Sequence, residues 1–192
     1  METFNDLPLL SFETPVGWAD WLAEHHQDQQ GVWLRYYKKA SGKPTIVYAE
    51  ALEVALCYGW IDSQAKSLDA ESYVQKYTPR RKRSPWSKIN RAKAEALIAA
   101  GKMQAPGLQE IEAARADGRW AAAYDSPKSM SVPSDFQALL DQHPEALAFF
   151  ESLSQTNRYA LLYRIQAAKK PETRQRWLDR SLAMLLNKET FH

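Results

Sequence analysis

The sequence contains 192 residues, of which 45% are hydrophobic and 25% are charged, proportions typical of a globular protein with one domain or one domain plus a smaller one. Its formal net charge is only +2, which excludes bulk electrostatic attraction as a basis for binding nucleic acid. The lone cysteine, Cys57, excludes an intrachain disulfide, and no apolar stretch approaches the roughly 18 residues of a membrane span. With no secretory leader visible, these features favour a cytoplasmic protein.

The first part of the chain mixes helical and extended patterns. Thr14 is a suitable N-cap and Pro15 a suitable first residue for a helix that carries Trp18 and Leu22 on one face. A second helix begins at Thr45 or Tyr48, and its wide apolar face predicts packing against a sheet. The expected elements are helices over 15–26 and 48–58 and strands over 32–37, 60–68 and 72–79.

From residue 84 onward the pattern is helical. Ser84 is placed to cap a helix whose first residue is Pro85 and which ends before Gly101. Residues 123–133 are small and polar with two prolines, so they are expected to form a linker. Further helices are expected over 108–117, 134–142, 144–152, 155–168 and 171–187.

These patterns predict an α+β fold class. A small antiparallel sheet packed with helices is expected in residues 1–122, and an all-helical C-terminal domain in residues 134–192.

Charge is distributed unevenly along the chain. Residues 1–30 carry six acids and no Lys or Arg, whereas residues 74–93 carry eight Lys or Arg and no acid. Residues 31–44 form a smaller island of four cations without an acid. Two basic islands therefore interrupt an otherwise acidic or neutral chain.

The larger island has the features of an anion-binding site. Four consecutive cations precede the predicted helix start, where backbone N–H groups lack partners and the helix dipole is positive. We expect the two islands to meet at the sheet edge. A solvated loop, or an internal pairing of these cations with the acids of residues 1–30, are the alternatives. The predicted site residues are Arg80, Arg81, Lys82, Arg83, Ser84, Trp86 and Ser87, with Lys43 from the smaller island.

Other residues carry weaker signals. Cys57 and Asp62 suit a nucleophile and a general base, but equally a buried helix residue and a turn residue. Tyr36 and Tyr37 suit stacking on nucleic-acid bases or packing in a core. No metal or other cofactor is predicted, because the histidines lack an i,i+4 pair or a cysteine partner; they are His25, His26, His143 and His192.

Several longer motifs resemble a known family. They are ALCYGWIDS (55–63), YTPRRKRSPWSKIN (77–90), GLQEIEAARADGRW (107–120), AAKKPETRQR (167–176) and MLLNKETFH (184–192). Through them the chain resembles, over roughly residues 30–192, the YdeI or OmpD-associated family, also called bacteriocin-protection proteins. The resemblance implies a role in stress or antimicrobial resistance and assigns no catalytic residues.

The sequence therefore favours a non-enzymatic binding protein that engages an anionic ligand or a partner protein through its basic loops. The alternative is a nucleic-acid-binding module that uses the same basic and aromatic residues, whose binding would weaken steeply with salt. An enzyme built around Asp62 and the arginines is a third hypothesis, for which no triad or metal signature is visible.

Overall fold

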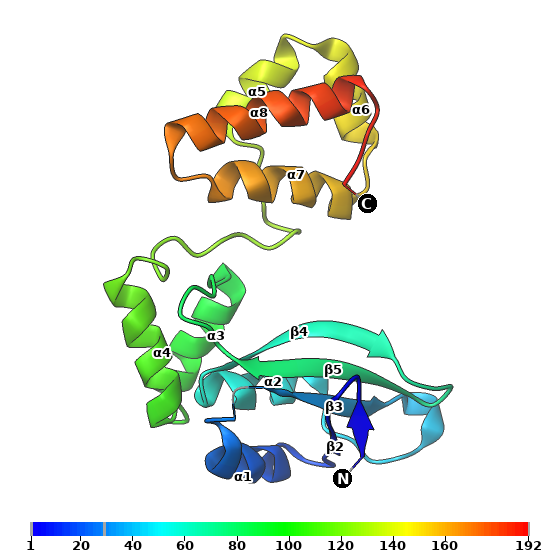
Figure 1. Cartoon of the computed structure of the whole chain (residues 1–192), viewed down its shortest axis with the longest axis vertical. Helices are drawn as coiled ribbons and strands as arrows, with labels where there is room; N and C mark the ends of the chain where they lie inside the picture. Colours follow the sequence, from blue (N-terminus) through cyan, green and yellow to red (C-terminus); the bar gives the residue numbers. More distant parts are fainter. Residues whose placement is uncertain (1, 29, 192) are drawn as a thin grey trace. The chain divides into compact units, whose positions relative to one another are not determined.

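The computed structural model describes residues 2–28 and 30–191, which divide into two compact units (Figure 1). The first unit comprises residues up to 86 together with 90–122, and the second comprises 87–89 together with the residues from 123 onward. Within the described residues, the first unit holds a five-stranded sheet and the chain from Ser134 onward is helical. The predicted α+β class is confirmed.

The sheet has the strand order β1-β2-β3-β5-β4. Neighbouring strands are antiparallel except for β2 and β3, which run parallel. The sheet was predicted to be antiparallel, and this one pair of strands departs from that prediction. The first two strands were not predicted, because Pro8 interrupts their short apolar run. The strands are β1 (Thr3–Phe4), β2 (Leu7–Ser11), β3 (Val32–Tyr37), β4 (Trp60–Ser67) and β5 (Ser72–Pro79).

Two helices cover one face of this sheet, namely α1 (Pro15–His25) and α2 (Tyr48–Cys57) (Figure 1). Alternation along β3 decides which side chains they meet, since Leu34 joins the core beneath the helices while Trp33 packs on the opposite face. Trp18 of α1 is fully buried, and its indole N–H donates to the carbonyl oxygen of Ala51 at 3.1 Å. This bond ties α1 to α2 across the core.

Two tyrosines, one from β3 and one from β5, belong to this core. The hydroxyl oxygens of Tyr36 and Tyr77 lie 2.9 Å apart, and both residues are almost fully buried. Burial raises the pKa of both phenols above their ordinary value, because ionisation in an apolar core loses hydration. The hydrogen bond satisfies the two buried hydroxyl groups together.

The first unit also contains a 3-10 turn (Lys39–Ser41) after β3 and two helices beyond the sheet, α3 (Lys88–Ala99) and α4 (Ala105–Ala116). The first two residues of α3 group with the second unit. No helix in the described part of the chain is long and apolar enough to cross a membrane.

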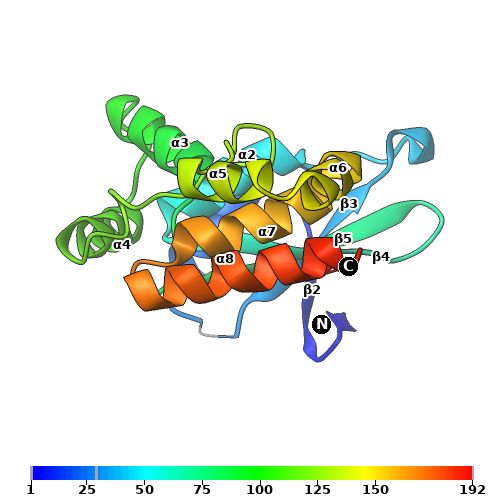
Figure 2. The same cartoon turned by 90° about the horizontal axis from the view of Figure 1, so that it is seen from above.

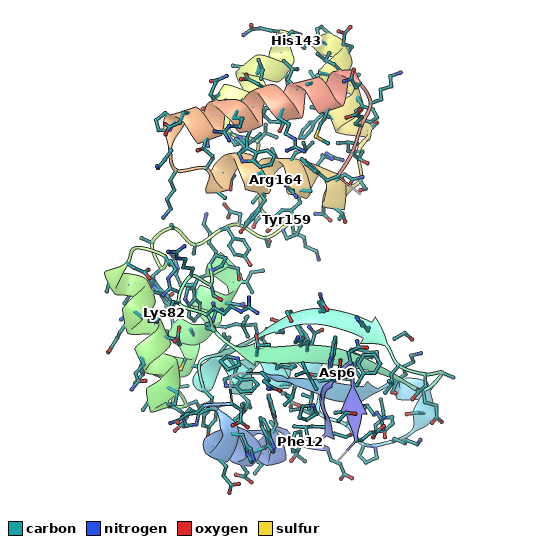
Figure 3. All side chains as sticks on the ribbon, viewed as in Figure 1. Asp6, Phe12, Lys82, His143, Tyr159 and Arg164 are labelled. Carbon is teal, nitrogen blue, oxygen red and sulfur yellow. The ribbon has the colours of Figure 1, made fainter. Side chains whose placement is uncertain are left out.

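The second unit is a helical bundle in which α8 packs against the other three helices (Figure 2). Arg174 of α8 forms a two-pronged ion pair with Asp135 at 2.7 and 2.9 Å. Arg164, labelled in Figure 3, lies with its guanidinium carbon 4.0 Å from the ring centre of Phe191, near the chain end. The helices are α5 (Ser134–Asp141), α6 (Pro144–Ser152), α7 (Gln155–Ala167) and α8 (Pro171–Leu186).

Leu34 is fully buried in the core beneath α1 and α2, so Leu34→Ala is expected to lower the free energy of unfolding by about 2–5 kcal/mol in urea melts. Leu108→Ala is the matched control. Leu108 is 37% exposed on α4, and its truncation should cost about 1 kcal/mol or less. Equal losses in the two variants would contradict this account of the core.

The Tyr36–Tyr77 pair predicts a loss of stability in alkali. Both folded pKa values exceed the unfolded value of about 10, so above that pH the unfolded chain binds fewer protons than the native one. The contribution is complete below about pH 10 and declines as the pH rises toward the folded values. Urea melts from pH 8 to 11 test this. The double variant Tyr36→Phe with Tyr77→Phe should show a shallower decline, and an unchanged slope would contradict the assignment.

Candidate anion-binding site

The four consecutive cations form a tight turn at the end of β5. The amide of Arg80 donates to the carbonyl oxygen of Gly59 at 2.9 Å, extending the strand's hydrogen bonding by one residue. The chain then reverses, because the amide of Ser84 donates to the carbonyl oxygen of Arg81 at 2.8 Å and the amide of Arg81 donates to Ser84 Oγ at 3.1 Å. The turn therefore has a defined backbone geometry.

This turn corrects the predicted helix start. Helix α3 begins at Lys88 instead of Pro85, since the Ser84 hydroxyl is engaged within the turn and does not cap a helix. The amide of Lys88 donates to the carbonyl oxygen of Tyr124 at 2.8 Å, and Ser87 forms a β-bridge with the same residue. The predicted cradle of free helix amides at Trp86 and Ser87 is therefore wrong.

Arg80 differs from the three cations that follow it. Only 6% of the residue is exposed, and its guanidinium carbon lies 3.6 Å from the ring centre of Trp86. One guanidinium N–H also donates to the carbonyl oxygen of Pro85 at 3.2 Å. Stacking of a desolvated guanidinium on tryptophan is among the stronger cation–π contacts. Arg80 thus closes the turn onto the segment that leads to α3.

A second tryptophan, Trp120, lies just after α4 and packs against Trp86. Trp120 packs edge-on against Trp86 with ring centres 4.8 Å apart. Arg115 lies with its guanidinium carbon 5.3 Å from the Trp120 ring centre, and Arg91 of α3 donates to the Trp120 carbonyl oxygen at 3.3 Å. Arg119 donates to the carbonyl oxygen of Ser84 at 3.0 Å, which links the segment just after α4 to the turn.

These contacts define a basic platform around Trp86 and Trp120, in which seven cations come from the turn, α3 and the α4 end. Two of the cations have acidic partners, since Arg119 pairs with Asp117 at 2.6 Å and Arg91 lies 3.8 Å from Glu95. The platform consists of Arg80, Arg81, Lys82, Arg83, Arg91, Arg115 and Arg119.

The three cations at the tip of the turn are Arg81, Lys82 and Arg83, and all are exposed. Figure 3 labels Lys82 on this segment between β5 and α3. Among the described residues none of the three has an ion pair, and the acid of Glu2 pairs instead with Arg35 at 2.7 Å. The tip cations are therefore available to an external anion.

Lys43 does not join the platform. In the antiparallel β3–β5 ladder, Tyr37 lies opposite Ser72 and Val32 lies opposite Tyr77, so the end of β3 and the end of β5 lie at opposite ends of the sheet. Lys43 follows the end of β3 and pairs there with Glu71 at 2.7 Å. The expectation that the two islands meet is therefore wrong, because the strands that precede them run in opposite directions.

The other residues that the sequence singled out, as catalytic, stacking or metal-binding candidates, are described by their burial and contacts. Burial, with the charge of Glu53, raises the pKa of the Cys57 thiol to about 11, which disfavours the thiolate needed of a nucleophile. Asp62 accepts a hydrogen bond from the Tyr48 hydroxyl at 2.8 Å. Tyr36 lies in the core with 1% of the residue exposed. His192 lies outside the described residues, within which no three His, Cys, Asp or Glu gather as metal ligands do.

Sequence reasoning missed two members of the platform, Arg115 and Arg119. The available signal was the pair Arg115 and Arg119, spaced by one helical turn and followed directly by Trp120. Nothing in the sequence shows that this tryptophan meets Trp86, which lies more than thirty residues earlier. That contact is a product of the fold.

Two family models match the chain on separate segments. Residues 10–110, more than half of the chain, match the family described as a domain of unknown function (DUF8412), and the chain belongs to that family. Residues 129–188 match the family described as bacteriocin-protection, YdeI or OmpD-associated, which confirms the resemblance for the helical unit. No curated protein and no solved structure matches the chain. The motifs 55–63 and 77–90 thus fall in the first match.

The different surroundings of neighbouring arginines predict different costs of removal. Arg80→Ala should lower the free energy of unfolding by about 1–3 kcal/mol, because it removes a desolvated stack and the packing of the side chain on Trp86. The double variant Arg81→Ala with Arg83→Ala should change it by about 0.5 kcal/mol or less, since both side chains are exposed and neither forms an ion pair with a described residue. Thermal or urea melts decide. A loss of several kcal/mol in the double variant would show that the tip cations serve the fold.

Proposed function

We propose that this is a non-enzymatic binding protein that holds an anionic ligand, or the acidic surface of a partner protein, on its basic platform. The observation that carries the proposal is the exposure of Arg81, Lys82 and Arg83, which form no ion pair with another described residue, on a turn fixed by the Arg81–Ser84 bonds and the buried Arg80 stack. The family description of the helical unit, bacteriocin-protection, supports a role in resistance to such agents.

The rigidity of the turn favours binding of a specific anion. A flexible chain of cations loses backbone freedom when it closes on a ligand, and this loss opposes binding. Here the bonds between Arg81 and Ser84, the Arg80 stack and the Arg119 bond hold the backbone before any ligand arrives. Two of the tip residues are arginines, whose planar guanidinium groups bind phosphate or carboxylate through two N–H groups at once.

Recognition of nucleic acid is the second candidate, and it rests on the same phosphate chemistry. The stacking part of that hypothesis loses support, because Tyr36 and Trp86 are each 1% exposed and offer no ring face to a base, and the half-buried Tyr37 lies at the opposite end of the sheet from the platform. Binding of a nucleic acid would therefore depend on phosphate contacts alone. Such binding is insensitive to base sequence and falls by orders of magnitude between about 50 and 200 mM salt when several phosphates are contacted.

The proposal predicts that replacing all three tip cations abolishes anion binding. The triple variant Arg81→Ala, Lys82→Ala and Arg83→Ala should bind pyrophosphate and a single-stranded oligonucleotide at least about tenfold more weakly than the unchanged protein, because two or more charge-assisted contacts disappear. Isothermal titration calorimetry measures the first ligand and fluorescence anisotropy the second, each across a salt series.

The double variant Lys39→Ala with Lys43→Ala is the matched control. It removes two exposed cations from the opposite end of the sheet and should leave both affinities within about twofold, since the platform is untouched. Pyrophosphate binding without oligonucleotide binding favours a small anionic ligand, and the reverse favours nucleic acid. Equal loss in the control and the triple variant would contradict a localised site, as would no binding of either probe or of an acidic peptide.

A further inference from the structure

A cleft lies in the first unit, and none of its lining residues belongs to the basic platform. It has a volume of about 360 Å³, within the range typical of small-molecule sites. One stripe of α2 and its C-cap line the cleft through residues spaced by one and two helical turns, together with Ala19 of α1 and Leu97 of α3. The residues of this stripe are Glu50, Glu53, Val54, Cys57 and Tyr58.

The two ends of this cleft carry opposite charges. Glu50 lies in the first turn of α2, and its carboxylate accepts a long bond of 3.4 Å from the amide of Val47. Lys102 belongs to the other end, because its neighbour Gln104 donates its amide to the Cys57 carbonyl oxygen at 3.2 Å. Among the described residues Lys102 has no ion pair. Glu50 and Cys57 lie seven positions apart on the helix, about 10 Å along its axis.

The middle of the cleft is apolar and electrically neutral. Val54, Ala19 and Leu97 supply its apolar surface. The one carboxylate in this stretch, on Glu53, is paired with Lys93 of α3 at 3.2 Å. The cleft therefore presents an anion, an apolar stretch and a cation in that order.

We infer that this cleft binds a short zwitterion, with its ammonium group at Glu50, its carboxylate at Lys102 and an apolar body over Val54. The matching chemistry is that of an ω-amino acid, which carries terminal charges of opposite sign across an apolar stretch; a dipeptide with apolar side chains carries the same two charges across a polar peptide group. Two charge-assisted contacts give orientation as well as affinity, because a reversed ligand would oppose like charges. The inference is independent of the basic platform.

Binding of defined probes tests the inference. Aminooctanoate and the dipeptide Ala-Leu are titrated against the full chain by calorimetry, with octylamine and octanoate as probes that each lack one terminal charge. Cys57 supplies a second readout, because this residue lines the cleft and carries the only thiol in the sequence. A bound zwitterion should slow alkylation of this thiol, whereas octylamine or octanoate at the same concentration should slow it much less.

Matched variants assign the two ends of the ligand. Lys102→Gln and Glu50→Gln should each weaken binding of the preferred zwitterion about tenfold or more, and glutamine preserves the acceptor to Val47. Lys128→Gln in the second unit and Glu112→Gln on the exposed side of α4 change the same charges elsewhere and should leave the affinity unchanged.

A preference for aminooctanoate supports an ω-amino acid, and a preference for Ala-Leu supports a peptide ligand. Three results would overturn the inference: binding of octylamine or octanoate as tight as that of the zwitterions, an unchanged affinity in Lys102→Gln and Glu50→Gln, or no binding of either zwitterion at millimolar concentration. Because the tip cations take no part, the triple variant at residues 81–83 should bind the zwitterion normally, which separates failure of this site from failure of the platform.

Discussion

The stacking of Arg80 on Trp86 is the contact on which the arrangement of the basic platform depends. Arg80 still belongs to the sheet, since its amide bonds to Gly59 beside the end of β5, whereas Trp86 leads into α3. The stack therefore fixes the point at which the chain leaves the sheet. Because Trp86 also packs on Trp120, the same contact places the end of α4 beside the turn. An exposed loop of cations without this anchor would have no fixed relation to Arg115 or Arg119.

Net charge conceals this local concentration of cations. The acids of the sheet region are engaged elsewhere, because Glu2 pairs with Arg35 and Glu71 pairs with Lys43. Both pairs lie at exposed or half-exposed positions and contribute little to stability, but they neutralise two of the four cations of the smaller island. The tip of the turn has no such neighbour among the described residues. Attraction of an anion to it is a short-range effect, because charges beyond about 8 Å are screened at physiological salt.

Local pattern was sufficient for most of the fold. The run of β-branched and aromatic residues located β3 at residues 32–37, and helical periodicity located the helices of the second unit, because each of these segments carries its signal in consecutive residues. It failed where tertiary or side-chain contacts decide. The strand Leu7–Ser11 is held by pairing with β3 in spite of Pro8, and the Ser84 hydroxyl bonds back to Arg81 instead of capping a helix. The four cations of the site could be predicted because they are adjacent in the sequence. The packing of Trp86 on Trp120 could not, because it is a tertiary contact.

The connection at the end of α2 positions both the cleft and the basic platform, and Gly107 of α4 allows α4 to pack closely against it. The Cys57 carbonyl accepts the amide of Gln104, which positions the cationic end of the cleft, and two residues later Gly59 accepts the amide of Arg80. Helix α4 reaches this connection closely enough that a Cβ atom at Gly107 would collide with the carbonyl oxygens of Leu56 and Cys57. Only glycine permits that approach of one backbone to another. The same short connection thus sets the positions of the cleft and of the arginines that α4 brings to the platform.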